Sequence, residues 1–403
     1  MRAVVWHGRE DVRVDAVEDP RIQKPTDAIV RVTSTAICGS DLHLYSKLWP
    51  VMRKGDILGH ETMGVVEEVG AAVEHIAPGD RVVIPFNISC GECFFCSRGL
   101  HSQCERTRDE GMLARAGSLL RRGKGASLFG YTHLYGAVPG GQAELVRVPQ
   151  AHFGPIKVPE GPPDERFLFL SDVLPTAWQA VVYAEIPPGG ILGVWGLGPI
   201  GQMCCRIALH RGAERVVGVD LVPERLSMAA RHGVETLDAA SVDDVRDVAL
   251  ELTDGRGFDS VIDAVGMEAD GSVLDKVLQT TKIQLDRTHV LRKSMQAVRR
   301  GGTLSLTGVY GGPVQMFPLG DLFDMQVTVR MGQANVRRWT DDILPLLTDE
   351  DPLGVGDLMT HRLPLERAPE AYALFQEKRD GAIKIVLDPR ASANGDGHAP
   401  ARG

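Results

Sequence analysis

The chain has 403 residues, of which 43% are hydrophobic and 24% are charged, with a formal net charge of −9. This composition is that of a soluble globular protein, and the length predicts two domains. The acidic balance argues against nucleic acid or an anionic membrane as a partner. No stretch approaches the roughly 20 apolar residues that span a bilayer, and no signal peptide is visible. Seven cysteines without a secretion signal indicate a reducing cytoplasm.

Short alternating runs rich in β-branched residues dominate the chain up to about residue 155. Examples are "AIVRVTSTAI", "MGVVEEVG" and "GDRVVIPF", which glycine, proline and aspartate separate. Such runs predict strands joined by tight turns, and therefore a β-rich first domain over residues 1–168.

Two segments of this domain, "AICGSDLH" and "ILGHETMG", carry side chains that bind metals or move protons. Each residue alone would more often be a core cysteine, a hydrogen-bonded histidine or a surface carboxylate. Only their combination suggests a site. The candidates are Cys38, Ser40, Asp41, His43, His60 and Glu61.

Four of the seven cysteines follow in "SCGECFFCSRGLHSQC", at the spacing C-x2-C-x2-C-x7-C. Thiolates this close repel one another unless a cation neutralises them, and Zn2+ suits four sulfurs at tetrahedral angles. An iron–sulfur cluster fits the spacing less well, and disulfides would need an oxidising compartment. Four sulfurs leave no coordination position for a substrate, so this zinc is expected to be structural. Its ligands would be Cys90, Cys93, Cys96 and Cys104.

The pattern changes after about residue 168, where buried strands such as "ILGVWGLG" and "ERVVGVD" alternate with helical segments. Strands that alternate with helices predict an α/β fold with a doubly wound parallel sheet over residues 169–333. Residues 334–388 return to mixed elements that end in the strand-like "GAIKIVLDP". The small, polar residues 389–403 are expected to be a disordered tail.

The segment "GLGPIG" ends one of these strands and opens a helix, which is the context of a dinucleotide-binding turn. Its glycines let the backbone approach a pyrophosphate, whose charge lies against amides at the helix start. Asp220 ends the next strand, and its carboxylate would bind ribose hydroxyls and repel a 2′-phosphate, so NAD is favoured over NADP. The candidate cofactor residues are Gly196, Gly198, Pro199, Ile200, Gly201, Asp220 and Arg225.

In this order, the segments resemble zinc-dependent medium-chain dehydrogenases of the alcohol dehydrogenase superfamily. The matching strings are "ICGSDLH", "LGHE", the four-cysteine loop, the glycine turn, and "LMTHRLPLERAPEAYALF" before "GAIKIVLDP". The resemblance implies a GroES-like catalytic domain, a Rossmann NAD-binding domain and a return to the first. It also implies two zinc ions per chain, one catalytic and one structural.

The resemblance assigns roles to the residues of the first domain. Cys38 and His60 become ligands of the catalytic zinc, and Glu61 becomes a neighbour that approaches the metal transiently. Asp41 becomes the hydrogen-bond partner of His60. Ser40 would lie beside the substrate oxygen.

The remaining roles concern proton transfer and the third ligand. His43 becomes the outer end of a proton relay through the nicotinamide ribose. In "SDVLPTAWQA", Asp172 stands where many alcohol dehydrogenases have a cysteine, and Thr176 where the family has a threonine beside the nicotinamide. The aspartate resembles the glutathione-independent formaldehyde dehydrogenase/dismutase branch. Alternatively, Asp172 caps a helix.

The expected protein is a cytoplasmic homotetramer or dimer that oxidises a small alcohol or hydrated aldehyde with NAD, and formaldehyde is a candidate substrate. The alternatives are a dehydrogenase of a larger alcohol or polyol, glutathione-dependent formaldehyde oxidation, and a catalytically silent relative. The long segment after Gly266 could retain NAD for aldehyde dismutation. Gly39 counts against this, because it lacks a charge that would bind the pyrophosphate. The basic segment over residues 105–140 is expected to be a solvated loop.

Overall fold

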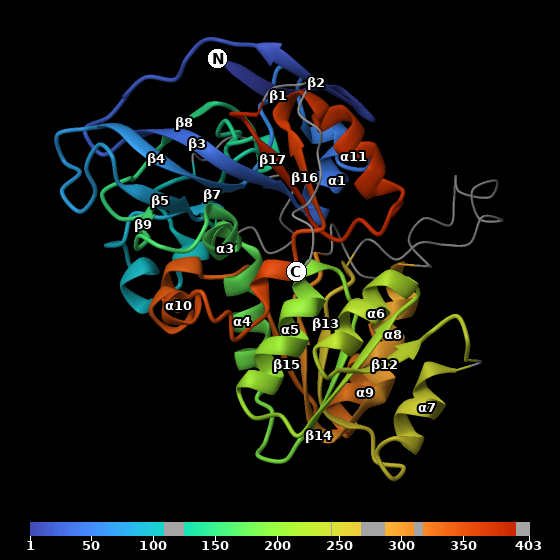
Figure 1. Ribbon diagram of the computed structural model, residues 1–403. Helices are drawn as coiled ribbons and strands as arrows, with labels where there is room; N and C mark the ends of the chain where they lie inside the picture. The colour runs from blue at the N-terminus through green and yellow to red at the C-terminus, as the bar shows by residue number, and fades with distance from the viewer. Residues whose placement is uncertain (109–124, 243, 267–286, 310–316, 392–403) are drawn as a thin grey trace. The chain divides into compact units, whose positions relative to one another are not determined.

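The computed structural model describes residues 1–108, 125–242, 244–266, 287–309 and 317–391 (Figure 1). The chain divides into two compact units. Unit 1 comprises Met1–Pro175 and Ala334–Gly403, and unit 2 comprises Thr176–Gln333. Both ends of the chain therefore belong to unit 1. From residue 392 onward, the expected disordered tail lies outside the described residues.

Unit 1 is built on a seven-stranded mixed sheet with the order β16-β17-β3-β4-β5-β9, and β8 also pairs with β3. Two further pairs, β1 with β2 and β6 with β7, are antiparallel. The strands are β1 (Arg2–Gly8), β2 (Asp11–Ala16), β3 (Ala28–Ile37), β4 (Glu61–Val69), β5 (Arg81–Ile84), β6 (Asn87–Ile88), β7 (Ser127–Leu128), β8 (Leu145–Val148), β9 (Ile156–Lys157), β16 (His361–Pro364) and β17 (Ile385–Asp388). The α-helices are α1 (Gly39–Ser46), α3 (Asp164–Leu168), α10 (Val336–Ile343) and α11 (Ala368–Gln376).

The long strand β3 organises this sheet, because it is buried along nearly its whole length. Only Arg31 of its ten residues is exposed. Apolar side chains of β3 pack with those of β4, β5 and β8 in one core cluster. β3 pairs antiparallel with β4, β8 and β17. The pairing with β17 sets Ile385 opposite Ile37, so the last strand lies beside the residue where β3 ends.

Unit 2 is a six-stranded parallel sheet with the order β12-β11-β10-β13-β14-β15, which confirms the predicted doubly wound α/β fold. Its strands are β10 (Ile191–Trp195), β11 (Arg215–Asp220), β12 (Glu235–Asp238), β13 (Phe258–Asp263), β14 (Val298–Leu306) and β15 (Thr328–Met331). Its helices are α5 (Pro199–His210), α6 (Pro223–Arg231), α7 (Val245–Glu251), α8 (Arg287–Ala297) and α9 (Leu319–Asp324). Helix α4 (Val173–Ala184) crosses the boundary between the units.

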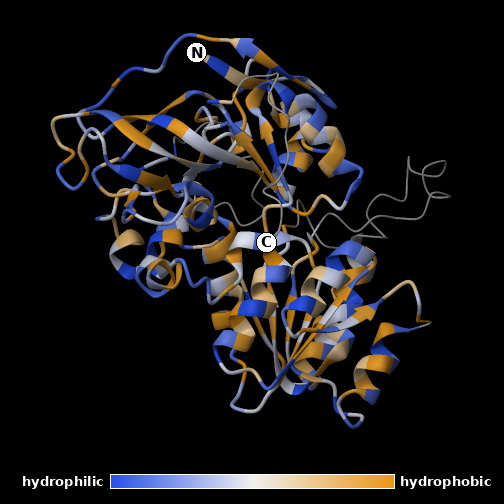
Figure 2. Cartoon of the chain, in the orientation of Figure 1, coloured by the Kyte–Doolittle hydropathy of each residue, from blue (hydrophilic) through white to orange (hydrophobic). Residues whose placement is uncertain are grey.

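The two outer strands of this sheet, β12 and β15, were not among the predicted strands. Both are short, and most of their side chains are exposed or half-buried. The inner strands β10, β11 and β13 are instead mostly buried, and Figure 2 shows hydrophobic residues along them. Parallel strands inside a doubly wound sheet read as continuous apolar runs. An edge strand lacks that run and is harder to find from sequence.

No single helix among the described residues is long and apolar enough to cross a membrane. One pair, Asp164–Ser171 with Val173–Ala184, passes the same test of length and composition together, but it is bent by 54°. Many of its apolar side chains are fully buried, among them Phe167, Leu170 and Leu174. Core helices of a globular protein have this property.

Candidate metal centres and cofactor turn

The first candidate centre begins where β3 runs into α1. Cys38 occupies the N-cap position of α1, and its backbone N–H donates to Asp41 Oδ2 over 3.0 Å. The carboxylate thereby satisfies one of the amides that a helix start leaves without a partner. This local turn fixes Asp41 relative to Cys38.

His60 immediately precedes β4 and follows Gly59, whose φ of +97° is accessible to glycine at little cost. Its Nδ1 lies 3.1 Å from Asp41 Oδ1. Its Nε2 lies 3.4 Å from Asp172 Oδ2 and 3.2 Å from the Ser40 hydroxyl. One ring nitrogen therefore faces Asp41, and the other faces the candidate ligands.

Asp172 follows the 3-10 helix η5 (Phe169–Ser171) and directly precedes α4. Its Oδ2 lies 3.5 Å from Cys38 Sγ. One donor atom each from Cys38, His60, Glu61 and Asp172 lies within 4.8 Å of the other three. The fold thus gathers into one group residues that are 134 positions apart in the chain.

The electrostatics of this group suit a divalent cation. Burial raises the pKa of the Cys38 thiol to about 11, and the Asp172 carboxylate acts in the same direction. Burial also raises the pKa of Glu61. Among the described residues, no hydrogen-bond donor reaches the buried Oε2 of Glu61. A thiolate, an imidazole and carboxylates are the donors that Zn2+ takes, and its charge would offset their buried negative charge. The residues therefore fit a zinc ion.

Lys384 was not among the residues predicted from the sequence, and its side chain contacts Glu61 of this group. Its ammonium forms an ion pair with Glu61 and donates to the Ile37 carbonyl over 3.1 Å. Both charged side chains are 0% exposed. A lysine inside the apolar run "GAIKIVLDP" was the signal in the sequence, because a lysine is almost never fully buried unless it is paired.

The second candidate centre is the four-cysteine loop. Its four sulfur atoms lie within 4.8 Å of one another, and all four side chains are buried without a disulfide. The Cys93 and Cys104 sulfurs are 4.0 Å apart, close to the roughly 3.8 Å that tetrahedral Zn–S bonds of about 2.3 Å would give. A hydrogen bond from the Cys96 thiol lowers the pKa of Cys104 to about 4. The set fits a closed zinc site.

The surroundings of this loop are structural. Asn335 Oδ1 accepts hydrogen bonds from the backbone N–H and the hydroxyl of Ser102, each over 3.0 Å. The Asn87 side chain donates to the Ala334 carbonyl over 2.6 Å. These contacts attach the returning segment of the chain to the loop and to β6.

We expect Cys93→Ser to lower the melting temperature by at least about 5 °C, since the loop would lose the zinc that closes it. The matched control is Cys205→Ala, which changes a buried cysteine outside both centres. Thermal unfolding and zinc content check the prediction together. Unchanged melting with both metals present would contradict it.

The predicted cofactor turn forms within unit 2. Gly196 has a φ of +86°, and a side chain on Gly201 would collide with the Gly196 carbonyl. Gly198 is the N-cap of α5, which begins with Pro199 and Ile200. The glycines therefore permit the tight turn that the motif predicts.

Asp220, at the end of β11, holds this turn in place. Its Oδ2 accepts from the Leu197 N–H over 2.6 Å, and its Oδ1 accepts from the Leu221 N–H over 2.7 Å and the Val222 N–H over 3.0 Å. Arg225 Nη1 lies 3.7 Å from Asp220 Oδ2. Among the described residues, a side chain on Gly198 would have only this guanidinium within 4 Å. The structure thus brings the predicted glycines, Asp220 and Arg225 together.

The remaining predicted residues and the other two cysteines are placed as follows. His43 is buried on α1, where its carbonyl accepts from the N–H groups of Lys47 and Leu48. Thr176 is the first residue of unit 2. Cys204 and Cys205 are buried on α5, apart from both centres. The segment expected to cover the adenosine spans residues 267–295; residues 267–286 lie outside the described residues, and the rest belongs to α8. Residues 109–124 of the basic segment also lie outside the described residues, whereas residues 126–132 are buried, so the prediction of a solvated loop is wrong there.

Two known protein families match the chain. The family "Alcohol dehydrogenase GroES-like domain" matches residues 24–160, and the family "Zinc-binding dehydrogenase" matches residues 199–286. Their order confirms the predicted succession of a GroES-like domain and a Rossmann domain.

Three relatives extend the match over nearly the whole chain. An uncharacterized zinc-type alcohol dehydrogenase-like protein of Bacillus subtilis is 41% identical over 392 residues, which are 96% of this chain and 100% of the relative. A formaldehyde dismutase of Pseudomonas putida is 30% identical over 412 residues, 96% of this chain and 97% of its own. The solved alcohol dehydrogenase of Thermus sp. ATN1 has a TM-score of 0.81 and 36% identity, covering 96% of this chain and 99% of that structure. The chain therefore belongs to the zinc-type alcohol dehydrogenase family of oxidoreductases.

Proposed function

We propose that this protein oxidises a small alcohol or hydrated aldehyde, with formaldehyde among the candidates, and passes the hydride to NAD. The observation that carries the proposal is the group of half-buried Cys38 with buried His60 and Asp172, in which the Ser40 hydroxyl lies 3.2 Å from His60 Nε2. When bound, zinc would polarise the substrate oxygen, and the nicotinamide would accept the hydride.

In this proposal, each of the residues has a defined role. Cys38, His60 and Asp172 hold the catalytic zinc, and Glu61 stands next to it. The hydroxyl of Ser40 accepts the proton of the substrate hydroxyl, since it lies beside the ligand group. His43 passes the proton onward, and Thr176 contacts the nicotinamide. The four-cysteine zinc takes no part in the chemistry.

Two aromatic side chains support a small substrate. The rings of Phe86 and Tyr131 stand edge-on to the His60 ring, with centroids 6.3 Å and 6.4 Å away. Both side chains are buried. They occupy volume beside the ligands, so they would limit the size of a substrate there.

The test is NAD reduction with alcohols of graded size, with formaldehyde added with and without glutathione. We expect the highest kcat/KM for short substrates and no requirement for the thiol. A clear preference for polyols or bulky alcohols would favour a dehydrogenase of larger alcohols. Because one relative is a formaldehyde dismutase, alcohol formation from aldehyde alone should also be measured. Alcohol formed without added NAD would favour a retained cofactor.

We expect kcat/KM with NAD to exceed kcat/KM with NADP by at least about 100-fold, because the Asp220 carboxylate opposes a 2′-phosphate. Arg225, 3.7 Å away, offsets part of this charge. The two cofactors should be compared in the unmodified protein, since Asp220 also holds the glycine turn. Comparable efficiencies would contradict the assignment.

We further propose that the protein is a cytoplasmic homo-oligomer, a tetramer or a dimer. Within the described part of unit 2, β15 is an edge strand of the sheet. Met331 on β15 is 61% exposed, and Leu319 and Phe323 on α9 are 69% and 81% exposed. Exposed apolar residues mark an interaction site where they form one contiguous patch, which we propose for these three. Light scattering of the purified protein tests the proposal.

A further inference from the structure

We propose that Tyr372 and Gln142 are positioning residues of the catalytic zinc site, acting on His60 through Asp41. The inference rests on the proposed function, because it takes His60 as a zinc ligand. It concerns two residues that carry no metal-binding or catalytic signal of their own.

A continuous line of buried polar contacts joins the four residues. The Tyr372 hydroxyl donates to Gln142 Oε1 over 2.8 Å. Gln142 Nε2 donates to the Ala36 carbonyl over 3.2 Å and to Asp41 Oδ2 over 3.4 Å. Asp41 Oδ1 lies 3.1 Å from His60 Nδ1, which is an ion-pair distance without the alignment of a hydrogen bond. All four side chains are buried, so water does not compete for these contacts.

The contact with Tyr372 determines which end of the Gln142 amide faces Asp41. A side-chain amide has one acceptor end and one donor end. The Tyr372 hydroxyl occupies the acceptor end, so the NH2 group of Gln142 faces Asp41. The other oxygen of the Asp41 side chain then faces His60 Nδ1. That arrangement favours a proton on Nδ1 and leaves Nε2 to face Cys38 and Asp172 as a ligand must.

The backbone around Gln142 is built for close approach to His60. The Gly141 N–H donates to the Gly59 carbonyl over 2.9 Å, and the Gln142 N–H donates to the Leu58 carbonyl over 3.0 Å. A side chain on Gly59 would collide with Gln142, and one on Gly141 would collide with Thr62. Two glycines therefore let the segment that carries Gln142 run directly against the residues on either side of His60.

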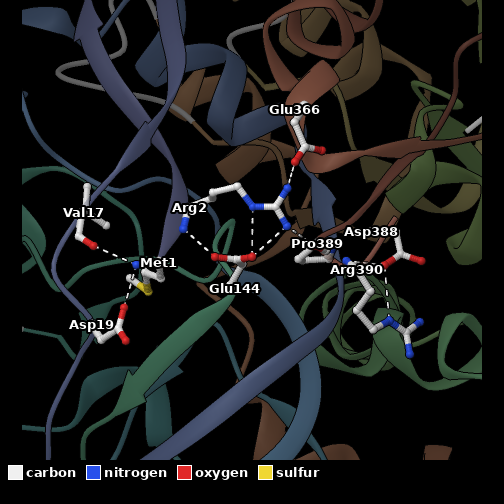
Figure 3. A network of polar contacts seen from close by, with 9 residues as sticks. All are labelled: Met1, Arg2, Val17, Asp19, Glu144, Glu366, Asp388, Pro389 and Arg390. Atoms are coloured by element: carbon white, nitrogen blue, oxygen red, sulfur yellow. Dashed lines mark hydrogen bonds and ion pairs between the residues drawn. The ribbon is translucent and has the colours of Figure 1, made fainter. Parts of the chain in front are cut away.

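A second network of polar contacts, centred on Arg2, joins the segments that carry Gln142 and Tyr372. Figure 3 shows the contacts of Arg2 with Glu144 and Glu366. Arg2 binds Glu144, two residues after Gln142, through Nε over 2.9 Å and Nη2 over 2.7 Å. The same guanidinium forms an ion pair with Glu366, in the 3-10 helix η10 (Leu365–Arg367) that leads into α11 and Tyr372. Arg2 thus ties together the segments that carry Gln142 and Tyr372.

The test is zinc retention by the purified protein against a chelator, without substrate. We expect Tyr372→Phe to accelerate loss of the catalytic zinc by about 5- to 10-fold and Gln142→Met by about 10- to 100-fold. The four-cysteine zinc is the internal control and should leave at the wild-type rate. Tyr45→Phe is the matched control. Tyr45 lies on α1, the helix that carries Asp41, and its ring centroid is 5.4 Å from that of Tyr372.

The double variant Tyr372→Phe/Gln142→Met distinguishes two cases: Tyr372 acts on the zinc site through Gln142, or the two residues act independently through packing. If Tyr372 acts through Gln142, adding Tyr372→Phe to Gln142→Met changes zinc retention no further. The proposal is overturned if Tyr372→Phe retains the catalytic zinc as the wild type does, if both zinc ions weaken equally, or if the two single effects multiply. Because no substrate is present, this outcome does not depend on whether the proposed reaction is correct.

Discussion

Replacing Lys384 with methionine is expected to lower the free energy of unfolding by about 3–5 kcal/mol, because it leaves the buried Glu61 carboxylate without its cation. Both side chains are 0% exposed, and the Lys384 ammonium forms an ion pair with Glu61. Burial already raises the pKa of Glu61, and Lys384 is the strongest influence against that rise. Urea unfolding of wild type and variant, with equal metal content, measures the effect.

The control for this prediction removes both charges. We expect Glu61→Gln/Lys384→Met to recover most of the lost stability, since no unpaired buried charge remains. Lys157→Met is the matched surface control. Lys157 also pairs with a carboxylate, that of Asp80, but it is 57% exposed, so its loss should cost less than about 1 kcal/mol. A Lys384→Met variant as stable as the Lys157→Met variant would refute the prediction.

Replacing Asp172 with alanine is expected to reduce turnover by more than about 100-fold and to leave one zinc per chain instead of two. The reason is geometric. Asp172 Oδ2 lies 3.5 Å from Cys38 Sγ and 3.4 Å from His60 Nε2, so its carboxylate closes the ligand group. Elemental analysis and NAD reduction measure the two effects on the same preparation.

Two further results bear on Asp172. Asp172→Cys supplies a different zinc ligand at the same position and should retain two zinc ions. The four-cysteine zinc should remain in both variants, since its ligands lie in another group. Two zinc ions and near-normal turnover in Asp172→Ala would mean that Asp172 is not a ligand and acts at the start of α4 instead.

Several features of this protein could be predicted from short stretches of sequence. The four cysteines lie within fifteen residues, so any fold of that loop keeps them close. The glycine turn likewise depends on the positive φ of Gly196 and on the absence of a side chain at Gly201. The inner strands of unit 2 are visible because strands buried on both faces require continuous apolar runs. The edge strands β12 and β15 have no such requirement, and their pattern did not reveal them.

The gathering of Cys38, His60, Asp172 and Lys384 is a property of the tertiary structure. The β17–β3 pairing sets Ile385 opposite Ile37, which delivers Lys384 to Glu61 across 323 residues of chain. Tyr372 likewise meets Gln142 across 230 residues. The sequence alone determined which chemical groups the chain carries and the local turns that present them. Only strand register and burial decided which distant groups meet, because an unpaired charge or polar group in the core costs free energy and a paired one costs less.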